Sequence, residues 1–125
     1  MAARIDALME GVFIRNDRER LERLAENLSP DFVYISPSAV VDGAQGLSDA
    51  FSHYRHDDRL HTSLRRSSPV EVHHGYLRYS WERIEQGRVA QQGWSFGQLD
   101  GAGKLERIVS FEGMVPTPTG ERSQD

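Results

Sequence analysis

Residues 89 to 113 read VAQQGWSFGQLDGAGKLERIVSFEG, and this stretch decides the fold class. Side chains on both sides of residues 100–103 (DGAG) alternate between two sets, as they do along β-strands, where successive side chains point to opposite faces. Closely spaced glycines after an aspartate are typical of a tight turn. The sequence therefore predicts two antiparallel strands, 89–99 and 105–113, joined by a hairpin.

The period of about two continues toward the N-terminus as far as Leu60. Residues 76–84 alternate well and end at the Gln86-Gly87 turn. Two shorter strands are predicted at 62–67 and 70–73, and the first of them carries two arginines, as a solvated or edge strand does. Residues 60–113 thus indicate four or five strands in an antiparallel meander.

Before residue 60 the apolar residues recur with the period of an α-helix. A first helix is predicted up to Phe13, and Asn16-Asp17 reads as a break and an N-cap that begins a second helix ending at Ser29-Pro30. Short strands follow at 32–35 and 39–41, and a third helix is predicted from 44 to about 56. The helical stripes are Ile5, Leu8, Met9, Val12 and Phe13, then Leu21, Leu24, Ala25 and Leu28, then Leu47, Ala50, Phe51 and Tyr54.

This order of elements predicts an α+β fold. We expect three N-terminal helices packed in the concave face of a curved, mixed or antiparallel sheet, which together form a cystatin-like cone. A sheet curved round helices leaves a concave space, and small-molecule sites favour such spaces. One domain is expected over residues 1–115, followed by a flexible tail at 116–125, which is rich in Pro, Thr, Gly and charge.

Composition narrows the function. The chain has 125 residues, a formal charge of −4 and no cysteine. Mild acidity argues against nucleic-acid binding, which normally needs a basic surface, and the lack of cysteine excludes thiolate chemistry and disulfides. The first residues contain charges and no long apolar run, so neither a signal peptide nor a membrane span is expected. We expect a soluble, cytoplasmic protein that has no membrane partner and needs no cofactor.

Three segments carry a resemblance to a known family. Residues 30–37 (PDFVYISP) resemble its first strand and turn, residues 42–43 (DG) its approach to the third helix, and residues 94–104 (WSFGQLDGAGK) its penultimate strand and hairpin. In this order and spacing, over residues 5–113, the chain is similar to the nuclear transport factor 2-like superfamily and its SnoaL-like domains. That superfamily includes ketosteroid isomerase, scytalone dehydratase, limonene epoxide hydrolase, polyketide cyclases and binding-only members, so the fold leaves the function open.

The resemblance implies where catalytic acids would stand. Ketosteroid isomerase-like members place a carboxylate base just before the proline of the first-strand turn and a second acid in the penultimate strand. In this chain those positions are Ser36 and Ser95. Because both acids are replaced by serine, steroid isomerisation by that mechanism is not expected. Epoxide hydrolysis needs an Asp-Arg-Asp group around a water, and the sequence places none inside the cone.

Strand alternation leaves two readings of the penultimate strand. If Ser95 faces the cavity, then Trp94 and Phe96 face outward, and the resemblance implies a homodimer through that sheet face. In the other reading, Trp94 and Phe96 belong to the core and Ser95 is exposed.

Several aromatic residues are candidates for a pocket wall. Leu77, Tyr79 and Trp81 share one face of their strand. With tyrosines and phenylalanines from the helices and the first strand, they would line a pocket suited to a flat ring that bears a carbonyl or hydroxyl group. The alternative is that these side chains simply fill the core. The candidate ligand-binding residues are Tyr34, Ser36, Tyr54, Tyr79, Trp81 and Ser95, and the wall would also include Phe13, Phe32 and Phe51.

One carboxylate is a candidate for proton transfer. Glu112 shares a strand face with Ile108 and Ser110, so it would lie at the pocket rim if that face lines the cavity. The alternative is an exposed glutamate at a strand end. His53 and His56 are near neighbours on a helix, but no third ligand is fixed by spacing, and so no metal is expected. His73 and His74 point to opposite faces of a strand, and one of them could face the cavity.

Together these features predict a SnoaL-like domain that binds a small hydrophobic or aromatic molecule. If it is an enzyme, it would be a cofactor-independent isomerase, cyclase or dehydratase that works by proton transfer. The alternative is a non-catalytic ligand-binding or dimeric interaction domain with a filled pocket.

Overall fold

The computed structural model describes residues 1–113. The predicted tail at 116–125 lies outside the described residues, and the domain boundaries stay a prediction. The helices of the described part are α1 (Ala2–Gly11), α2 (Asp17–Ala25), α3 (Gly43–Ala50) and α4 (Ser52–His56). The strands are β1 (Leu28–Ser36), β2 (Ala39–Asp42), β3 (Ser63–Arg66), β4 (Glu71–His73), β5 (Tyr76–Glu85), β6 (Arg88–Leu99) and β7 (Leu105–Glu112).

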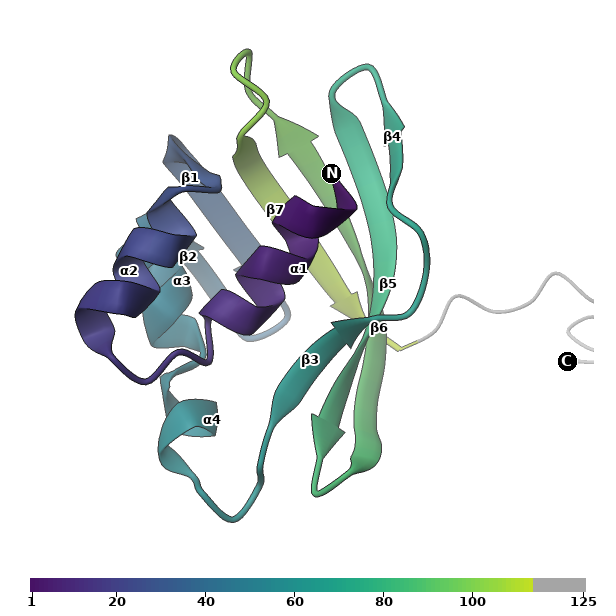
Figure 1. The fold of residues 1–125 in the computed structure, drawn as a ribbon. Coiled ribbons are helices and arrows are strands. Elements are labelled where there is room, and N and C mark those ends of the chain that lie inside the picture. Colours follow the sequence, from purple (N-terminus) through teal and green to yellow (C-terminus); the bar gives the residue numbers. More distant parts are fainter. Residues whose placement is uncertain (114–125) are drawn as a thin grey trace, which may run out of the picture.

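All seven strands form one mixed sheet in the order β2-β1-β7-β6-β5-β3, and β4 also pairs with β5 (Figure 1). Every neighbouring pair is antiparallel except β1 and β7, which run parallel. Parallel pairing is possible here because β1 and β7 are the first and last strands of the described residues, with β2 to β6 and the helices α3 and α4 between them. The α+β class and the mixed sheet predicted from the sequence are confirmed.

The sheet curves round the helices, which lie on its concave side (Figure 1). Register shifts interrupt the β1–β7 pair between Leu28 and Val33, the β5–β6 pair between Arg83 and Ile84, and the β6–β7 pair between Gln98 and Leu99. Such irregularities bend strands and increase local twist. They give the sheet the curvature that a flat, regular ladder lacks.

Two boundaries differ from the sequence-based expectation. The second helix ends at Ala25, and β1 already begins at Leu28, so Pro30 lies inside a strand rather than terminating a helix. Pro30 falls in the irregular part of the β1–β7 ladder, where a missing N–H breaks no regular pairing. The predicted third helix is interrupted at Phe51 (φ −106°, ψ 7°), which separates α3 from α4.

The predicted cap of α2 is confirmed, because the Asn16 side chain accepts a hydrogen bond from the Glu19 amide at 2.8 Å.

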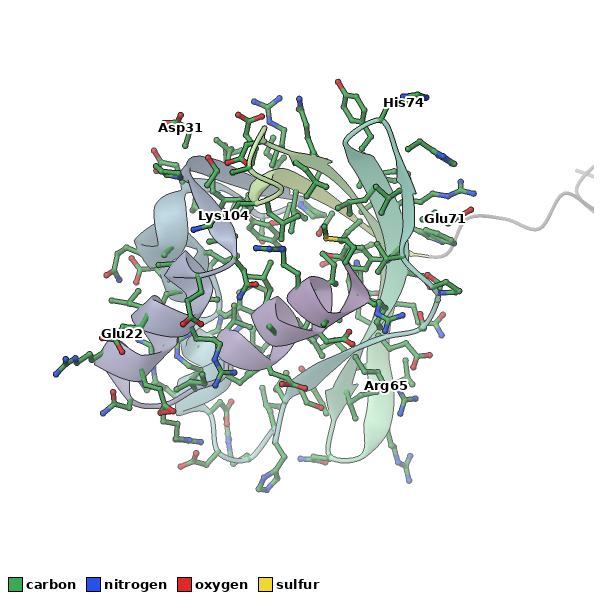
Figure 2. All side chains as sticks on the ribbon, turned by 45° about the horizontal axis from the view of Figure 1, so that its top comes forward. Glu22, Asp31, Arg65, Glu71, His74 and Lys104 are labelled. Carbon is green, nitrogen blue, oxygen red and sulfur yellow. The ribbon has the colours of Figure 1, made fainter. Side chains whose placement is uncertain are left out.

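The core lies between the helices and the concave face of the sheet. The buried apolar residues come from both layers: Ile5, Leu8, Met9, Val12, Leu24, Leu28, Phe32, Leu47, Leu77, Tyr79, Leu105 and Ile108. Charged side chains such as Glu22, Arg65 and Glu71 point away from this core (Figure 2). Within residues 1–113, no helix has the length and apolar character needed to cross a membrane.

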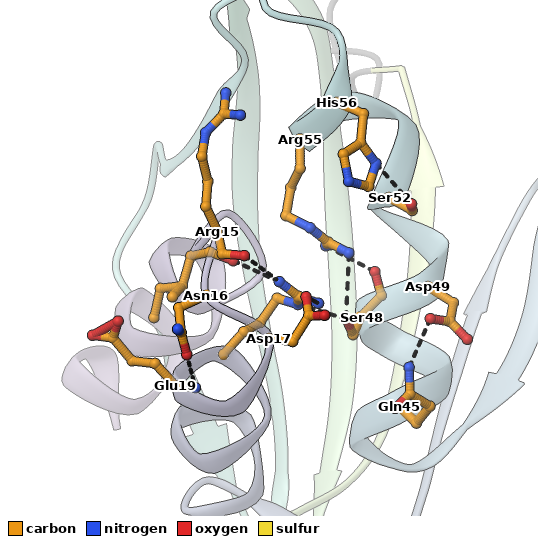
Figure 3. Close-up of polar contacts among 12 residues, drawn as sticks. Arg15, Asn16, Asp17, Glu19, Gln45, Ser48, Asp49, Ser52, Arg55 and His56 are labelled. Atoms are coloured by element: carbon orange, nitrogen blue, oxygen red, sulfur yellow. Dashed lines mark hydrogen bonds and ion pairs between the residues drawn. The ribbon is translucent and has the colours of Figure 1, made fainter.

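Two buried arginines join the helices beside the core. The Arg20 guanidinium donates to the Ser48 hydroxyl at 2.7 Å, to the Ile14 carbonyl at 2.8 Å and to the Asp17 carboxylate at 2.7 Å. Arg55 donates through Nη1 to the Ser48 carbonyl oxygen at 2.8 Å (Figure 3) and, also at 2.8 Å, to the carbonyl oxygen of Val12. Burial lowers the pKa of Arg55, and the hydrogen bond from Arg20 lowers the pKa of Asp17. These contacts tie α4 to α3 and to the end of α1.

Candidate functional site

A cavity of about 140 Å³ lies between the concave sheet and helices α1, α3 and α4. An engineered apolar cavity of about 150 Å³ holds benzene, so this space suits about one ring. Its wall is mostly apolar. The apolar lining residues before strand β3 are Leu8, Met9, Val12, Pro37, Ala39, Leu47, Ala50 and Phe51, and strands β3, β5 and β7 add Leu64, Trp81 and Ile108.

A row of hydroxyl groups crosses the sheet at the inner end of the cavity. Tyr79 on β5 lies opposite Ser95 on β6, which in turn lies opposite Ser110 on β7. Ser95 is only 1% exposed, and its Oγ lies 2.7 Å from the Ser110 Oγ. Ser36 on β1 follows Ile35, which pairs with Val109, so the parallel ladder brings Ser36 alongside Ser110. All four of these residues line the cavity.

Tyr79 and Tyr34, whose hydroxyl groups meet this row of serines, remain neutral at physiological pH. Burial raises the pKa of Tyr79 to about 12, although a hydrogen bond with Ser95 acts in the opposite direction. Burial likewise raises the pKa of Tyr34, against the effect of hydrogen bonds with Ser110 and Ser36. A neutral phenol can donate a hydrogen bond to a carbonyl or hydroxyl oxygen. The inner end of the cavity is therefore polar and carries no formal charge.

Two glycines of β6 leave space for side chains of the neighbouring strand β5 to lie over the β6 backbone. A Cβ at Gly93 would overlap the Phe111 carbonyl oxygen and the Trp81 ring, and a Cβ at Gly97 would lie 2.9 Å from Leu77 Cδ1. Trp81 therefore rests directly over Gly93. Its buried Nε1 has no hydrogen-bond partner among residues 1–113.

The mouth of the cavity carries the charged groups. Arg83 follows Trp81 on the same face of β5, and its Nη1 donates to Glu85 at 2.7 Å. The Arg83 guanidinium also lies over the Tyr54 ring, 5.1 Å from its centroid. Glu112 is exposed at the end of β7, and His53 stacks on Tyr54 with ring centroids 3.8 Å apart. Arg83, Glu112 and His53 all line the cavity.

The structure brings the sequence-predicted residues together at one place. Ser36, Tyr34, Tyr54, Tyr79, Trp81, Ser95 and Glu112 all line the cavity, although their roles in binding or catalysis stay predictions. The two readings of β6 are resolved by burial, because Ser95 is inside while Phe96 is 41% exposed on the opposite face. The observed alternation therefore follows the first reading.

Other expectations about the wall are wrong. Phe32 is fully buried in the core. Phe13, just beyond α1, packs against this core and edge to face on Phe51, with ring centroids 6.0 Å apart. Neither of the two residues lines the cavity. His73 and His74 are both exposed at the β4–β5 turn, and His74 adopts a left-handed backbone conformation (φ 49°) that directs it away from the cone (Figure 2). Neither histidine reaches the cavity.

Sequence reasoning does not single out several cavity residues, among them Arg83, Ser110 and His53. Strand alternation could have identified Arg83, because it lies two residues beyond Trp81 and so shares the face of Tyr79 and Trp81. Ser110 was placed on the correct face but was not singled out. His53 was considered only as a metal ligand with His56, whose Nδ1 instead lies 3.2 Å from the Ser52 hydroxyl. Among the described residues, no three His, Asp or Glu side chains are arranged to hold a metal ion.

Comparison with known proteins places the fold. No protein-family profile and no curated protein sequence matches this chain. Among solved structures, a candidate isomerase of the SnoaL-like family from Agrobacterium tumefaciens is similar with a TM-score of 0.78 and 16% identity, over 90% of this chain and 96% of that chain. A candidate polyketide cyclase from Sinorhizobium meliloti gives a TM-score of 0.65 at 12% identity, over 88% and 94% of the two chains.

A third neighbour was crystallised with a small molecule. TerC, co-crystallised with polyporic acid, gives a TM-score of 0.62 at 15% identity, over 88% of this chain and 91% of that chain. At such low identities the likeness establishes the fold and leaves the activity open. The chain therefore has the fold of the nuclear transport factor 2-like superfamily, with SnoaL-like proteins among its structural neighbours.

Proposed function

We propose that this chain binds a small hydrophobic or aromatic molecule in the cavity between its helices and its curved sheet. One observation carries the proposal: an apolar wall of single-ring size converges on the neutral hydroxyl row of Tyr79, Ser95 and Ser110. Ligand sites in proteins typically combine an apolar lining with a few well-placed polar groups. The neighbour crystallised with polyporic acid supports a small-molecule partner.

A catalytic version of this proposal uses proton transfer without a cofactor. Tyr79 and the adjacent serine hydroxyls would hold a ligand oxygen, and Glu112 or His53 at the mouth would move the proton. Isomerisation, cyclisation and dehydration are the reactions that this arrangement favours, because each moves a proton near an oxygen-bearing carbon. The candidate isomerase and the candidate cyclase among the structural neighbours support this version.

The first test is a thermal-shift screen of the full chain against single-ring phenols and acids, terpenoids, larger aromatic polyketide-like compounds, steroids and fatty acids. A ligand at a hundred times its dissociation constant adds about 2.7 kcal/mol to the unfolding free energy. For a domain of this size the melting temperature rises by on the order of ten degrees. We expect such shifts with single-ring compounds, and a lack of any shift would contradict the proposal.

A matched pair of variants assigns the shift to the cavity. Ala50 lines the cavity, and its neighbour Asp49 is exposed on the same helix. Ala50→Leu should reduce or abolish the ligand-induced shift by occupying the space, whereas Asp49→Leu should leave it unchanged. Equal shifts in both variants would place the ligand elsewhere on the protein.

A second candidate function is a dimeric interaction domain. On the convex face of the sheet, Phe96 and Phe111 are 41% and 56% exposed, and their rings meet edge to face at 5.9 Å. Exposed aromatic clusters of this kind are typical of protein–protein contacts. We propose that this face forms a homodimer, whether or not the cavity also binds a ligand.

A further inference from the structure

The cavity carries charge at its mouth and none at its inner end, and this difference constrains the ligand further. Among its lining residues, only Arg83, Glu112 and His53 bear groups that can be charged at neutral pH. The inner end is formed by tyrosine and serine hydroxyls. A ligand that contacts both ends must therefore carry a charged group toward the mouth and a neutral hydrogen-bonding group toward the inner end.

Arg83 is a fixed cation rather than a mobile one. Its side chain is 19% exposed, its Nη1 is held by Glu85, and its guanidinium is stacked on Tyr54. A guanidinium has five N–H donors, and among residues 1–113 the hydrogen bond of Arg83 involves Nη1 alone. The remaining donors form part of a planar fork that matches the two oxygens of a carboxylate.

The spacing between the two ends suits one substituted ring. Arg83 and Tyr79 are four residues apart on β5, which is about 13 Å of strand. The Arg83 side chain covers part of that length, and the Trp81 ring lies between the two positions on the same face. The cavity volume of about 140 Å³ sets the same limit, because it holds about one ring.

We infer that the ligand is a single-ring acid whose carboxylate binds Arg83 at the mouth and whose ring oxygen reaches the Tyr79–Ser95–Ser110 hydroxyl row. Its ring lies against Trp81. This inference rests on the proposed function, since it names the ligand class of the same cavity. The carboxylate of Glu112 does not repel the ligand carboxylate at close range. Glu112 lies on β7, two strands from Arg83 on β5, and two strand spacings are about 10 Å across the sheet.

The sequence offers a closely matched control for Arg83. Arg78 lies on the opposite face of the same strand, pairs with Glu71 at 2.6 Å, and lies over the Trp94 ring at 5.8 Å. Both arginines therefore combine a carboxylate partner with an aromatic ring. Only Arg83 lines the cavity.

The test measures the affinity of three probes by isothermal titration calorimetry at pH 7 and low salt. The probes are 4-hydroxybenzoate, its neutral methyl ester and the cation 4-hydroxybenzylamine. We expect the acid to bind about tenfold more tightly than the ester, which is the effect of one charge-assisted hydrogen-bonded pair. In Arg83→Gln this preference should fall to about twofold or less, and in Arg78→Gln it should persist.

The outcomes separate this inference from the proposed function. If the ester binds as well as the acid, or if the preference survives Arg83→Gln, the inference is wrong although the cavity still binds rings. Tighter binding of the amine would also overturn it and would point to Glu112 as the anchor. If no probe binds, the inference is wrong, and the thermal-shift screen against the other compound classes decides whether the proposed function fails as well. The ratio of acid to ester affinity in the unaltered protein tests the inference even if a variant does not fold.

Discussion

At the scale of single residues, the cavity depends on positions where side chains are small. Gly93 is the clearest case, because the Trp81 ring and the Phe111 carbonyl oxygen occupy the space that a Cβ would need. Gly101, in the β6–β7 turn, has nothing within 4 Å of an added Cβ. Two glycines that look alike in the sequence therefore differ in what surrounds them.

We expect Gly93→Ala to lower the unfolding free energy by about 3 kcal/mol, because the added methyl group meets backbone as well as a ring. Gly97→Ala should cost less, since its nearest neighbour is the end of the Leu77 side chain. Gly101→Ala should be neutral or slightly stabilising. Urea denaturation of the three variants checks this order, and an equal loss in all three would contradict the packing described for Trp81.

The role of Glu112 is a second prediction at this scale. If the chain is an enzyme, Glu112→Gln should reduce turnover about a hundredfold or more, because the amide cannot accept and return a proton. The variant should keep its ligand-induced thermal shift. Glu26→Gln changes an exposed glutamate outside the cavity and should leave turnover unchanged. Unchanged turnover in Glu112→Gln would exclude the glutamate role and leave His53 as the candidate.

At the scale of elements, the short helix α4 is held in place by one buried arginine. Five residues are too few for a stable isolated helix. Arg55 donates to the carbonyl oxygens of Val12, at the end of α1, and Ser48, in α3. Because α4 also carries His53 and Tyr54, these hydrogen bonds position one side of the cavity mouth.

We expect Arg55→Met to lower the unfolding free energy by about 2 kcal/mol, since it removes the donor to the buried Val12 carbonyl oxygen. The Ser48 carbonyl oxygen loses Arg55 as well but still accepts from the Phe51 amide at 3.2 Å. Arg59→Met, just beyond α4, should leave the unfolding free energy nearly unchanged, because Arg59 is exposed and its ion pair with Asp57 is a surface one. Denaturation gives the free energies, and amide hydrogen exchange should be faster in α4 of Arg55→Met. Equal effects of the two substitutions would show that α4 is held by other contacts.

At the scale of the whole molecule, the two faces of the curved sheet carry different side chains. The concave face encloses the cavity. The convex face presents Phe96 and Phe111 to solvent, with Trp94 beside them under Arg78. The alternation of β6 thus assigns serine and glycine to one face and aromatic residues to the other.

We expect the chain to form a homodimer in solution at micromolar concentration, and Phe111→Lys to shift it to the monomer, because a charge in a buried apolar contact is strongly unfavourable. Val40→Lys is the control, since Val40 is 73% exposed on β2, away from the aromatic cluster. Light scattering after size exclusion measures the mass. A monomeric unaltered protein would contradict the proposed dimer.

Local patterns in the sequence predict the α+β class, the strand alternation and the shared face of Tyr79 and Trp81, but they leave the face of Ser95 open. These features depend on local periodicity, since a side chain two residues along a strand must return to the same face. Tertiary structure alone decided that β1 pairs parallel with β7, that the helix breaks at Phe51, and that Phe13 and Phe32 miss the cavity. It also joined Tyr79, Ser95 and Ser110 into one row and placed Arg83 on Tyr54. Such contacts join residues far apart in the chain, and their register depends on bulges and packing that no local pattern encodes.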